Sequence, residues 1–169
     1  VREQTYKNIE HIIIDNNSTD GTLEIIKKHN LTYYSEPAES IFDAFNKGVQ
    51  HAKGKYIIFL NSDDYYHYSH GIEECVKVLE ETNSDFCYSE CNIICHSDLV
   101  VQLEPDIYNV FRIMPVCHQT VMCKKELLEK YPFDTKYEKI ADYKWFMSLI
   151  LDKISFCEVK CNFVNSKNY

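Results

Sequence analysis

The chain lacks the long apolar run that a membrane-spanning helix would need. No stretch approaches the roughly 18 consecutive apolar residues of such a helix, so we expect no transmembrane segment. Basic residues are also scarce, because 18 Lys and Arg stand against 26 Asp and Glu and give a formal net charge of −8. Nucleic acids and anionic membranes select for clustered cations. We therefore expect no nucleic-acid partner and no broad attraction to anionic lipids, while peripheral membrane association stays open.

The sequence also lacks a C-x-x-C pair, although it contains eight cysteines. Zinc sites usually use such tight pairs, and most of these cysteines lie in apolar segments. We therefore expect reduced, buried cysteines in a cytoplasmic protein, with the inner face of the membrane as an alternative location. Metal binding stays open for the C-x-x-x-C-x-x-x-C run from Cys87 to Cys95. No repeat divides the 169 residues, which we interpret as a single domain.

The first half of the chain alternates strand and helix patterns. The expected elements are strands at 12–14, 32–35 and 56–60, and helices that begin near 18–20, 41 and 72. This order predicts an α/β fold with a parallel sheet that helices cover. Ligands of such sheets bind beyond the carboxyl ends of the strands, where Asp15 and the pair Asp63–Asp64 are expected.

The second half has a less regular pattern. Its expected elements are short strands within 85–104 with a hairpin around His96 to Asp98, an irregular stretch at 105–119, helices at 126–131 and 141–151, and a strand region at 154–164. We interpret residues 1–104 as a nucleotide-type half and residues 105–169 as a smaller mixed half of the same domain.

Two adjacent acids, Asp63 and Asp64, follow the strand expected at 56–60. Like charges that are close together and partly buried repel each other, and a divalent cation would relieve that cost. Carboxylate oxygens suit Mg²⁺ or Mn²⁺. The alternative is that residues 61–64 form a polar turn and helix cap, a common role for Asn and Asp. The pattern alone leaves both interpretations open.

A further acid, Asp142, opens the helix expected at 141–151. Trp145, Phe146 and Leu149 follow it at helical spacing, so the acid shares the apolar face of that helix. The helix dipole stabilises an N-terminal acid by about 0.3–1 kcal/mol, which gives Asp142 a purely structural explanation. The same position keeps a carboxylate ionised and therefore also suits a base.

Five segments in this order resemble the motifs of the inverting glycosyltransferases of family 2, which have the GT-A fold. They are I-I-I-D-N-N-S-T-D-G-T (12–22), S-E-P-x-x-x-I-F-D-A-F-N-K-G (35–48), G-K-Y-I-I-F-L-N-S-D-D (54–64), V-C-H-Q-T-V-M (116–122) and I-A-D-Y (140–143). The subgroup that they resemble builds bacterial O-antigens and exopolysaccharides. The resemblance implies a Rossmann-like, mostly parallel sheet, and inverting transfer of a sugar from a nucleotide-sugar donor to a glycan or lipid-linked acceptor. A UDP-sugar is the favoured donor.

The resemblance also implies roles for individual residues. Asp142 would be the catalytic base, and Asp64 would bind the Mg²⁺ or Mn²⁺ that bridges the donor diphosphate. The donor-binding residues would be Asp15 at the nucleobase, Asp63 at the sugar or ribose, and Asn17, Asp43 and Asn46. His118 and Gln119 would lie on the acceptor side, although a hydrogen-bonded structural histidine is the alternative for His118.

Two features depart from the family's pattern. Ala38, Glu39 and Ser40 replace the usual Asp-Lys-Gly beside the donor. The family also begins with a strand and loop of the type V-S-I-I-x-P-x-Y-N, whereas V-R-E-Q-T-Y-K-N-I-E matches the end of the helix that follows. We therefore expect a longer chain whose first strand lies between the strands that end at Asp15 and Asp64, and little transferase activity without that strand.

Two other functions compete with a glycosyltransferase. A nucleotidyltransferase would share the sheet and the clustered acids, but it would need a glycine-rich basic loop near its start, and the sequence shows none. The alternative from a different class is a degenerate, non-catalytic sugar-nucleotide-binding or scaffold domain, which the two departures from the family's pattern favour.

Overall fold

A computed structural model describes residues 1–95 and 100–167 of the chain. A small sheet contains β1 (Ile12–Asp15) and β2 (Thr32–Ser35), which pair in parallel, and α1 (Thr22–Lys28) connects them. This confirms the parallel strand–helix–strand pattern expected at the start of the chain. The helix begins at Thr22, slightly later than expected, because the Asp20 carboxylate accepts a hydrogen bond from the Thr22 amide (3.1 Å) and closes a turn before the helix.

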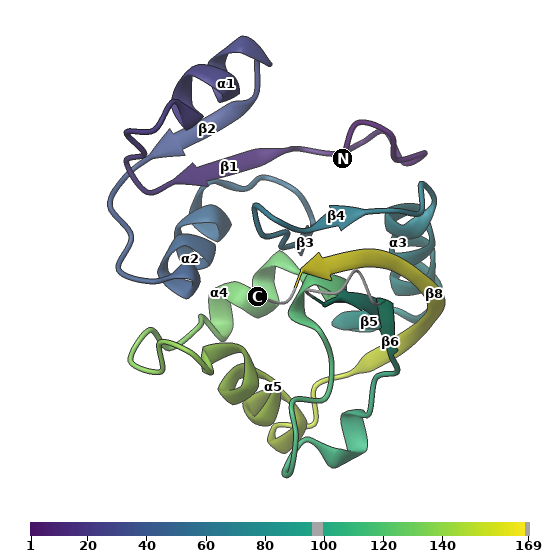
Figure 1. The fold of residues 1–169 in the computed structure, drawn as a ribbon. Helices are drawn as coiled ribbons and strands as arrows, with labels where there is room; N and C mark the ends of the chain where they lie inside the picture. The colour runs from purple at the N-terminus through teal and green to yellow at the C-terminus, as the bar shows by residue number, and fades with distance from the viewer. Residues whose placement is uncertain (96–99, 168–169) are drawn as a thin grey trace.

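The larger sheet combines strands from both halves of the chain (Figure 1). Its order is β3-β7-β5-β8-β4, with β6 paired to β5. The strands are β3 (Tyr56–Ile58), β4 (Tyr65–Tyr66), β5 (Phe86–Ile94), β6 (Val100–Leu103), β7 (Met122–Lys124) and β8 (Phe156–Lys167). Only β5 and β8 pair in parallel here, so the larger sheet is mixed rather than mostly parallel. Local patterns in the first half contain no signal for β7 and β8, which enter the sheet between β3 and β4.

Helices flank the larger sheet (Figure 1). They are α2 (Ile41–His51), α3 (Gly71–Thr82), α4 (Lys125–Lys130) and α5 (Ala141–Leu151), and short 3₁₀ turns occur at Ile107–Asn109 and His118–Thr120. The bounds of α5 are those expected from the sequence. A Cβ atom on Gly71 would lie 2.3 Å from the Phe163 ring, so glycine lets α3 pack closely against β8.

The helix α2 links the small sheet to the larger one. A Cβ atom on Gly48 would lie 3.5 Å from the Ile14 side chain of β1, so the helix packs against that side chain. One turn earlier in the helix, the Phe45 ring stacks on Phe59, just after β3, with centroids 4.2 Å apart. Within the described ranges no strand joins β1 to β3. The helix α2 therefore fixes the position of the end of β1, at Asp15, relative to the end of β3, which precedes the 61–64 turn.

The cysteines differ in part from the expectation. Cys91 and Cys117 form a disulfide, with Cα atoms 6.7 Å apart, so the expectation of eight reduced cysteines is wrong for this pair. Sequence spacing does not reveal that β5 packs against the turn that begins at His118, beside Cys117. Cys75, Cys87 and Cys123 are buried free thiols as expected, and burial raises the pKa of Cys123.

Two further expectations concern the course of the chain. The hairpin tip expected at His96 to Asp98 lies outside the described residues, although β5 and β6 on either side of it pair antiparallel. In the part of the chain that the structure describes, no helix combines the length and the apolar character needed to cross a bilayer.

Candidate active site

Asp15 is a buried carboxylate at the end of β1. Its Oδ2 accepts hydrogen bonds from the Ser18 amide (3.0 Å) and the Ser35 hydroxyl (2.7 Å). Hydrogen bonding by Ser18 and, to a smaller extent, by Ser35 lowers the pKa of Asp15, although burial acts in the opposite direction. The side chain is therefore an ionised acceptor at neutral pH, the form that an N–H donor of a nucleobase would bind.

The loop after β1 is attached to the loop after β2. The side-chain oxygen of Asn16 accepts a hydrogen bond from the Ala38 amide (2.7 Å), and the Ser35 hydroxyl lies 3.2 Å from Oδ1 of Asn17. Asn17 has a φ of 53°, a left-handed conformation that asparagine adopts more readily than most residues. The segment at 38–40 that departs from the family's pattern thus lies beside the predicted donor-binding loop.

Asp43 fixes the start of α2. Its amide donates to Oγ of Ser40 (3.1 Å) and its Oδ2 accepts from the Glu39 amide (3.1 Å), which together form a reciprocal helix cap. Lys47 lies 2.8 Å from the same oxygen and lowers the pKa of Asp43. These contacts give Asp43 a structural role, and its role in donor binding stays a prediction.

Asn46 joins α2 to the loop before α5. Its Nδ2 donates to the Phe133 carbonyl (2.8 Å), and its Oδ1 accepts from the Phe133 amide (3.0 Å). Both polar atoms of the side chain therefore bind the backbone of one residue that is distant in the sequence. This pairing positions the loop that leads to Asp142, and direct donor binding by Asn46 stays a prediction.

Replacing Asn46 with Ala should destabilise the fold by about 1–3 kcal/mol, because the Phe133 backbone loses both partners. Urea unfolding followed by circular dichroism measures this loss. The matched control is Gln50→Ala on the exposed side of the same helix, which should change the free energy of unfolding by less than about 0.5 kcal/mol. Equal losses in the two variants would contradict the structural role of Asn46.

Asp63 and Asp64 lie in the turn between β3 and β4. The Asp64 amide donates to the Asn61 carbonyl (3.2 Å), and the Asp64 side chain is buried. The side-chain amide of Gln119 donates to Oδ2 of Asp64 (2.9 Å) and to Oγ of Ser166 (3.0 Å). Gln119 is therefore placed against the predicted metal ligand, where it orients the carboxylate.

His118 is placed against the predicted base. Its Nδ1 lies 3.2 Å from Oδ2 of Asp142, and both side chains are mostly buried. An ionised carboxylate can only accept hydrogen bonds, so Nδ1 carries the proton in this contact. Oδ1 of Asp142 accepts from the Tyr143 amide (2.8 Å), and Nε2 of His118 lies 3.4 Å from Nδ2 of Asn61. One turn, His118–Gln119, thus contacts both the 61–64 turn and the start of α5.

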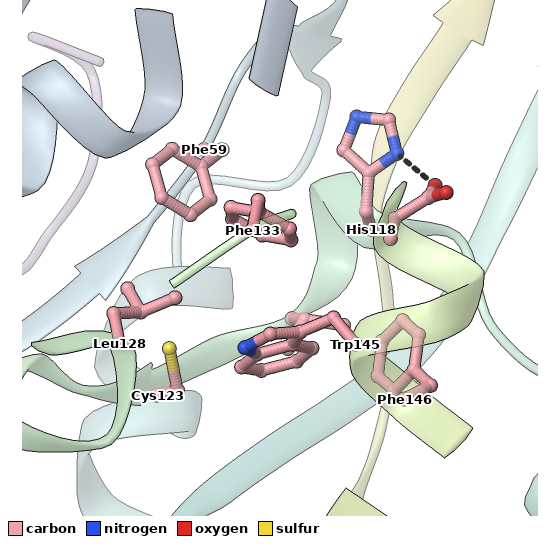
Figure 2. Close-up of a pocket in the computed structure, with 9 residues that line it drawn as sticks. Phe59, His118, Cys123, Leu128, Phe133, Trp145 and Phe146 are labelled. Carbon is pink, nitrogen blue, oxygen red and sulfur yellow. Dashed lines mark hydrogen bonds and ion pairs between the residues drawn. The ribbon is translucent and has the colours of Figure 1, made fainter. Parts of the chain in front are cut away.

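Aromatic side chains surround His118, and Figure 2 shows Trp145 and Phe146 below it. The His118 ring packs edge-on against Phe45 and Phe42, with centroids 5.7 and 6.4 Å away. A cavity of about 10 Å³, roughly the size of one water, is lined by Phe59, His118, Val121, Cys123, Leu128, Phe133, Asp142, Trp145 and Phe146. The dyad of His118 and Asp142 therefore rests on a closely packed apolar core that limits its movement.

The 61–64 turn offers the kind of ligand that Mg²⁺ and Mn²⁺ prefer. Oδ1 of Asn61 is buried and has no hydrogen-bond partner among the described residues, and the Asp64 carboxylate belongs to the same turn. In residues 1–95 and 100–167, no three His, Cys, Asp or Glu side chains could hold a metal by themselves. Mg²⁺ usually binds through one or two carboxylates plus substrate phosphates, so a cation here would need the donor diphosphate.

Sequence reasoning missed the polar partners of the predicted site residues. Asn61 lies in the N-S-D-D motif, and its position beside two acids was a usable signal. Ser35 also lies within a motif that resembles the family, whereas Ser166 lies in β8 with no local signal. Its contact with Gln119 depends on the pairing of strands that are far apart in the sequence.

Comparisons with known proteins agree with this architecture. The model of the family described as Glycosyl transferase family 2 matches residues 1–154. WfgD of Escherichia coli, a UDP-Glc:alpha-D-GlcNAc-diphosphoundecaprenol beta-1,3-glucosyltransferase, is 27% identical over 99% of this chain and 68% of its own length. An uncharacterized glycosyltransferase of Rickettsia felis is 40% identical, but over 51% of this chain and 15% of its own length.

Solved structures resemble the fold at low sequence identity. Residues 1–349 of S. aureus TarS in complex with UDP superpose with a TM-score of 0.75 at 20% identity, covering 98% of this chain and 54% of that one. The mannosyltransferase PcManGT from Pyrobaculum calidifontis, in complex with GDP-Man and Mn2+, gives a TM-score of 0.70 at 19% identity over 98% of this chain and 50% of its own. The chain thus spans about half the length of these two solved chains. The family match and the shared architecture show that the chain belongs to glycosyl transferase family 2 and has the GT-A fold.

Proposed function

We propose that the chain contains the donor-binding and catalytic core of a metal-dependent, inverting glycosyltransferase. The observation that carries this proposal is the His118–Gln119 turn, because its two side chains contact Asp142 and Asp64. One carboxylate is thereby suited to act as a base, and the other to bind a cation together with the donor diphosphate. The proposed base, Asp142, and the proposed metal ligand, Asp64, are thus held in fixed positions relative to each other.

In this mechanism Asp142 accepts the proton of the acceptor hydroxyl, a step that typically contributes 10²–10⁴-fold to the rate. His118 holds the carboxylate through Oδ2. Asp64 and Asn61 would hold Mg²⁺ or Mn²⁺, which supplies Lewis-acid stabilisation of the leaving diphosphate when bound. Asp15 would accept from the nucleobase and Asp63 would contact the sugar or ribose. Attack from the face opposite the diphosphate inverts the anomeric carbon.

The relatives suggest the class of donor and acceptor. The names of WfgD and of WfaP of Escherichia coli give UDP-Glc as the donor and a GlcNAc-diphosphoundecaprenol as the acceptor. TarS has been solved with UDP-GlcNAc. We infer a UDP-sugar donor and a lipid-linked glycan acceptor for this chain, used in polysaccharide biosynthesis. For such an acceptor we propose a reaction in the cytoplasm, at the inner face of the membrane.

Calorimetry with UDP-glucose and GDP-mannose, each with Mn²⁺ and with EDTA, tests this function. We expect the UDP-sugar to bind at least about 10-fold more tightly with Mn²⁺, and Mn²⁺ alone to bind weakly because its ligand set is incomplete. Equal affinity in EDTA would contradict the metal assignment. Tight binding of the UDP-sugar without transfer to any glycan acceptor would instead support the non-catalytic alternative. The changed segment at 38–40 favours that alternative.

A further inference from the structure

A strongly apolar surface lies on the loop formed by residues 106–115, which we call the apolar loop. In Figure 1 it lies at the foot of the view, below β6 and α5. Its exposed apolar side chains, with their exposed fractions, are Tyr108 (88%), Phe111 (61%), Ile113 (53%) and Met114 (38%). Large apolar side chains gathered on one exposed loop usually mark an interaction surface, because water solvates them poorly.

The apolar loop is held in one conformation by its own backbone. The Asp106 amide donates to the Pro115 carbonyl (2.8 Å) and closes the loop. Ile107 and Val110 are buried in the core between α2, α5 and β5, so they anchor the loop from inside. The exposed apolar side chains are therefore presented on a fixed base, and little conformational entropy would be lost when they are covered.

A groove of about 450 Å³ separates the apolar loop from the end of α5. The lining residues are Ile107, Tyr108, Val110 and Phe111 on the loop side, and Ile150, Lys153, Ile154 and Phe156 on the other. The groove extends the apolar surface beyond the loop itself, so the surface includes the C-terminal end of α5, the helix whose first turn contains Asp142.

Two exposed cations flank the apolar surface. Arg112 lies between Phe111 and Ile113 in the sequence, and Lys153 lines the groove. Among the described residues neither cation makes an ion pair. The nearby Asp106 and Asp152 accept hydrogen bonds from the neutral side chains of Asn109 and Tyr131, so both acids keep their charge and the local surface carries charges of both signs. Exposed apolar groups beside unpaired cations complement an anionic lipid surface. The net charge of −8 opposes long-range attraction to such a surface, so apolar insertion must carry the contact.

We propose that the apolar loop is a membrane-docking surface. Its exposed apolar side chains insert into the interfacial region of an anionic bilayer, while Arg112 and Lys153 contact lipid phosphates. The inference rests on the proposed function, because a lipid-linked acceptor is available only at a membrane. Docking through this surface would keep the start of α5 within one helix length of the lipid.

The length of α5 sets an upper limit on that distance. Asp142 and Ile150 lie at opposite ends of the helix, so a rise of 1.5 Å per residue separates them by about 12 Å. The headgroup layer on each side of a bilayer is roughly 5–7 Å thick. Whatever the tilt of α5, a docked domain would thus hold Asp142 within about 12 Å of the end of the helix that borders the groove, close to the headgroup layer.

Flotation of the protein with phosphatidylcholine vesicles, with and without phosphatidylglycerol, tests this surface. We expect the protein to float with the anionic vesicles, and the double variant Tyr108→Ser, Phe111→Ser to lower the partition coefficient at least about 10-fold. The matched control is Ile25→Ser, which removes an apolar side chain of similar exposure (60%) from α1 and should leave partitioning unchanged. Arg112→Glu with Lys153→Glu should weaken binding to the anionic vesicles only.

A second measurement reports insertion directly. Tyr108→Trp places a fluorophore at an exposed position of the apolar loop, and its emission should shift to the blue when anionic vesicles are added. The native Trp145 is buried, so it contributes a constant background. No shift, or equal partitioning of the double variant and the wild type, would overturn the proposal.

Two other results would also overturn it. If a second copy covers the surface, sedimentation will show a dimer that the double variant dissociates, without an effect on vesicles. If another segment of the protein covers it, the double variant will lower the unfolding midpoint without an effect on vesicles. Calorimetry with the UDP-sugar is independent of the loop, so a failure of donor binding and a failure of docking are distinguishable.

Discussion

Replacing Asp142 with Asn is expected to lower kcat by about 10²–10⁴-fold and to leave the Kd for the donor within about twofold. The amide cannot accept the acceptor proton, yet it has nearly the same shape and keeps an oxygen for the Tyr143 amide. Product formation from a UDP-sugar gives kcat, and calorimetry gives the Kd. A large loss of kcat with an unchanged donor Kd identifies a group that acts on the acceptor rather than on the donor.

A matched control is available at the other end of the same helix. Asp152 accepts a hydrogen bond from the Tyr131 hydroxyl (2.7 Å) and has no contact with the His118–Gln119 turn. Asp152→Asn should leave kcat within about twofold of the wild type. If Asp142→Asn instead keeps its activity and only loses about 0.3–1 kcal/mol of stability, its carboxylate is a helix-terminal charge and not a base.

Asp64→Asn is expected to weaken donor binding in the presence of Mn²⁺ on the order of 100-fold. The donor affinities measured with Mn²⁺ and with EDTA should then be the same. An amide is a far poorer ligand for a hard cation than a carboxylate. Its oxygen can still accept from Gln119, so the fold should be retained. Calorimetry measures the affinity, and the thermal midpoint by circular dichroism reports the fold.

The control for Asp64 is Asp20→Asn, a change of the same type at an exposed residue beside α1. It should alter neither the donor affinity nor its dependence on Mn²⁺. If Mn²⁺ still strengthens donor binding in the Asp64→Asn variant, Asp64 is not a metal ligand. The 61–64 turn would then have only a structural role.

Local sequence patterns predicted the parts of this fold that depend on local physics. The helical spacing around Trp145 gave α5 with its observed bounds, and the apolar runs gave the strands that precede Asp15 and the 61–64 turn. In each case the signal lies within one turn of helix or one short strand, where periodicity and capping decide the conformation.

Contacts between distant segments could not be predicted in the same way. The contacts of the Gln119 amide with Asp64 and Ser166 have no local signal, because β8 returns from the end of the chain to lie beside β5 and β4. The Cys91–Cys117 disulfide has the same origin. Strand pairing over such separations depends on tertiary packing, which local propensity does not encode. The acceptor-side role of Gln119 stays a prediction.

A crystal structure of the protein with Mn²⁺ and a UDP-sugar would test the central claim most directly. The claim predicts Mn²⁺ bonded to a carboxylate oxygen of Asp64 and to the diphosphate, the nucleobase beside Asp15, and Asp142 on the face of the sugar opposite the leaving group. Metal–oxygen distances should be about 2.0–2.2 Å. A nucleotide bound away from the 61–64 turn, or a diphosphate on the same side of the sugar as Asp142, would contradict it.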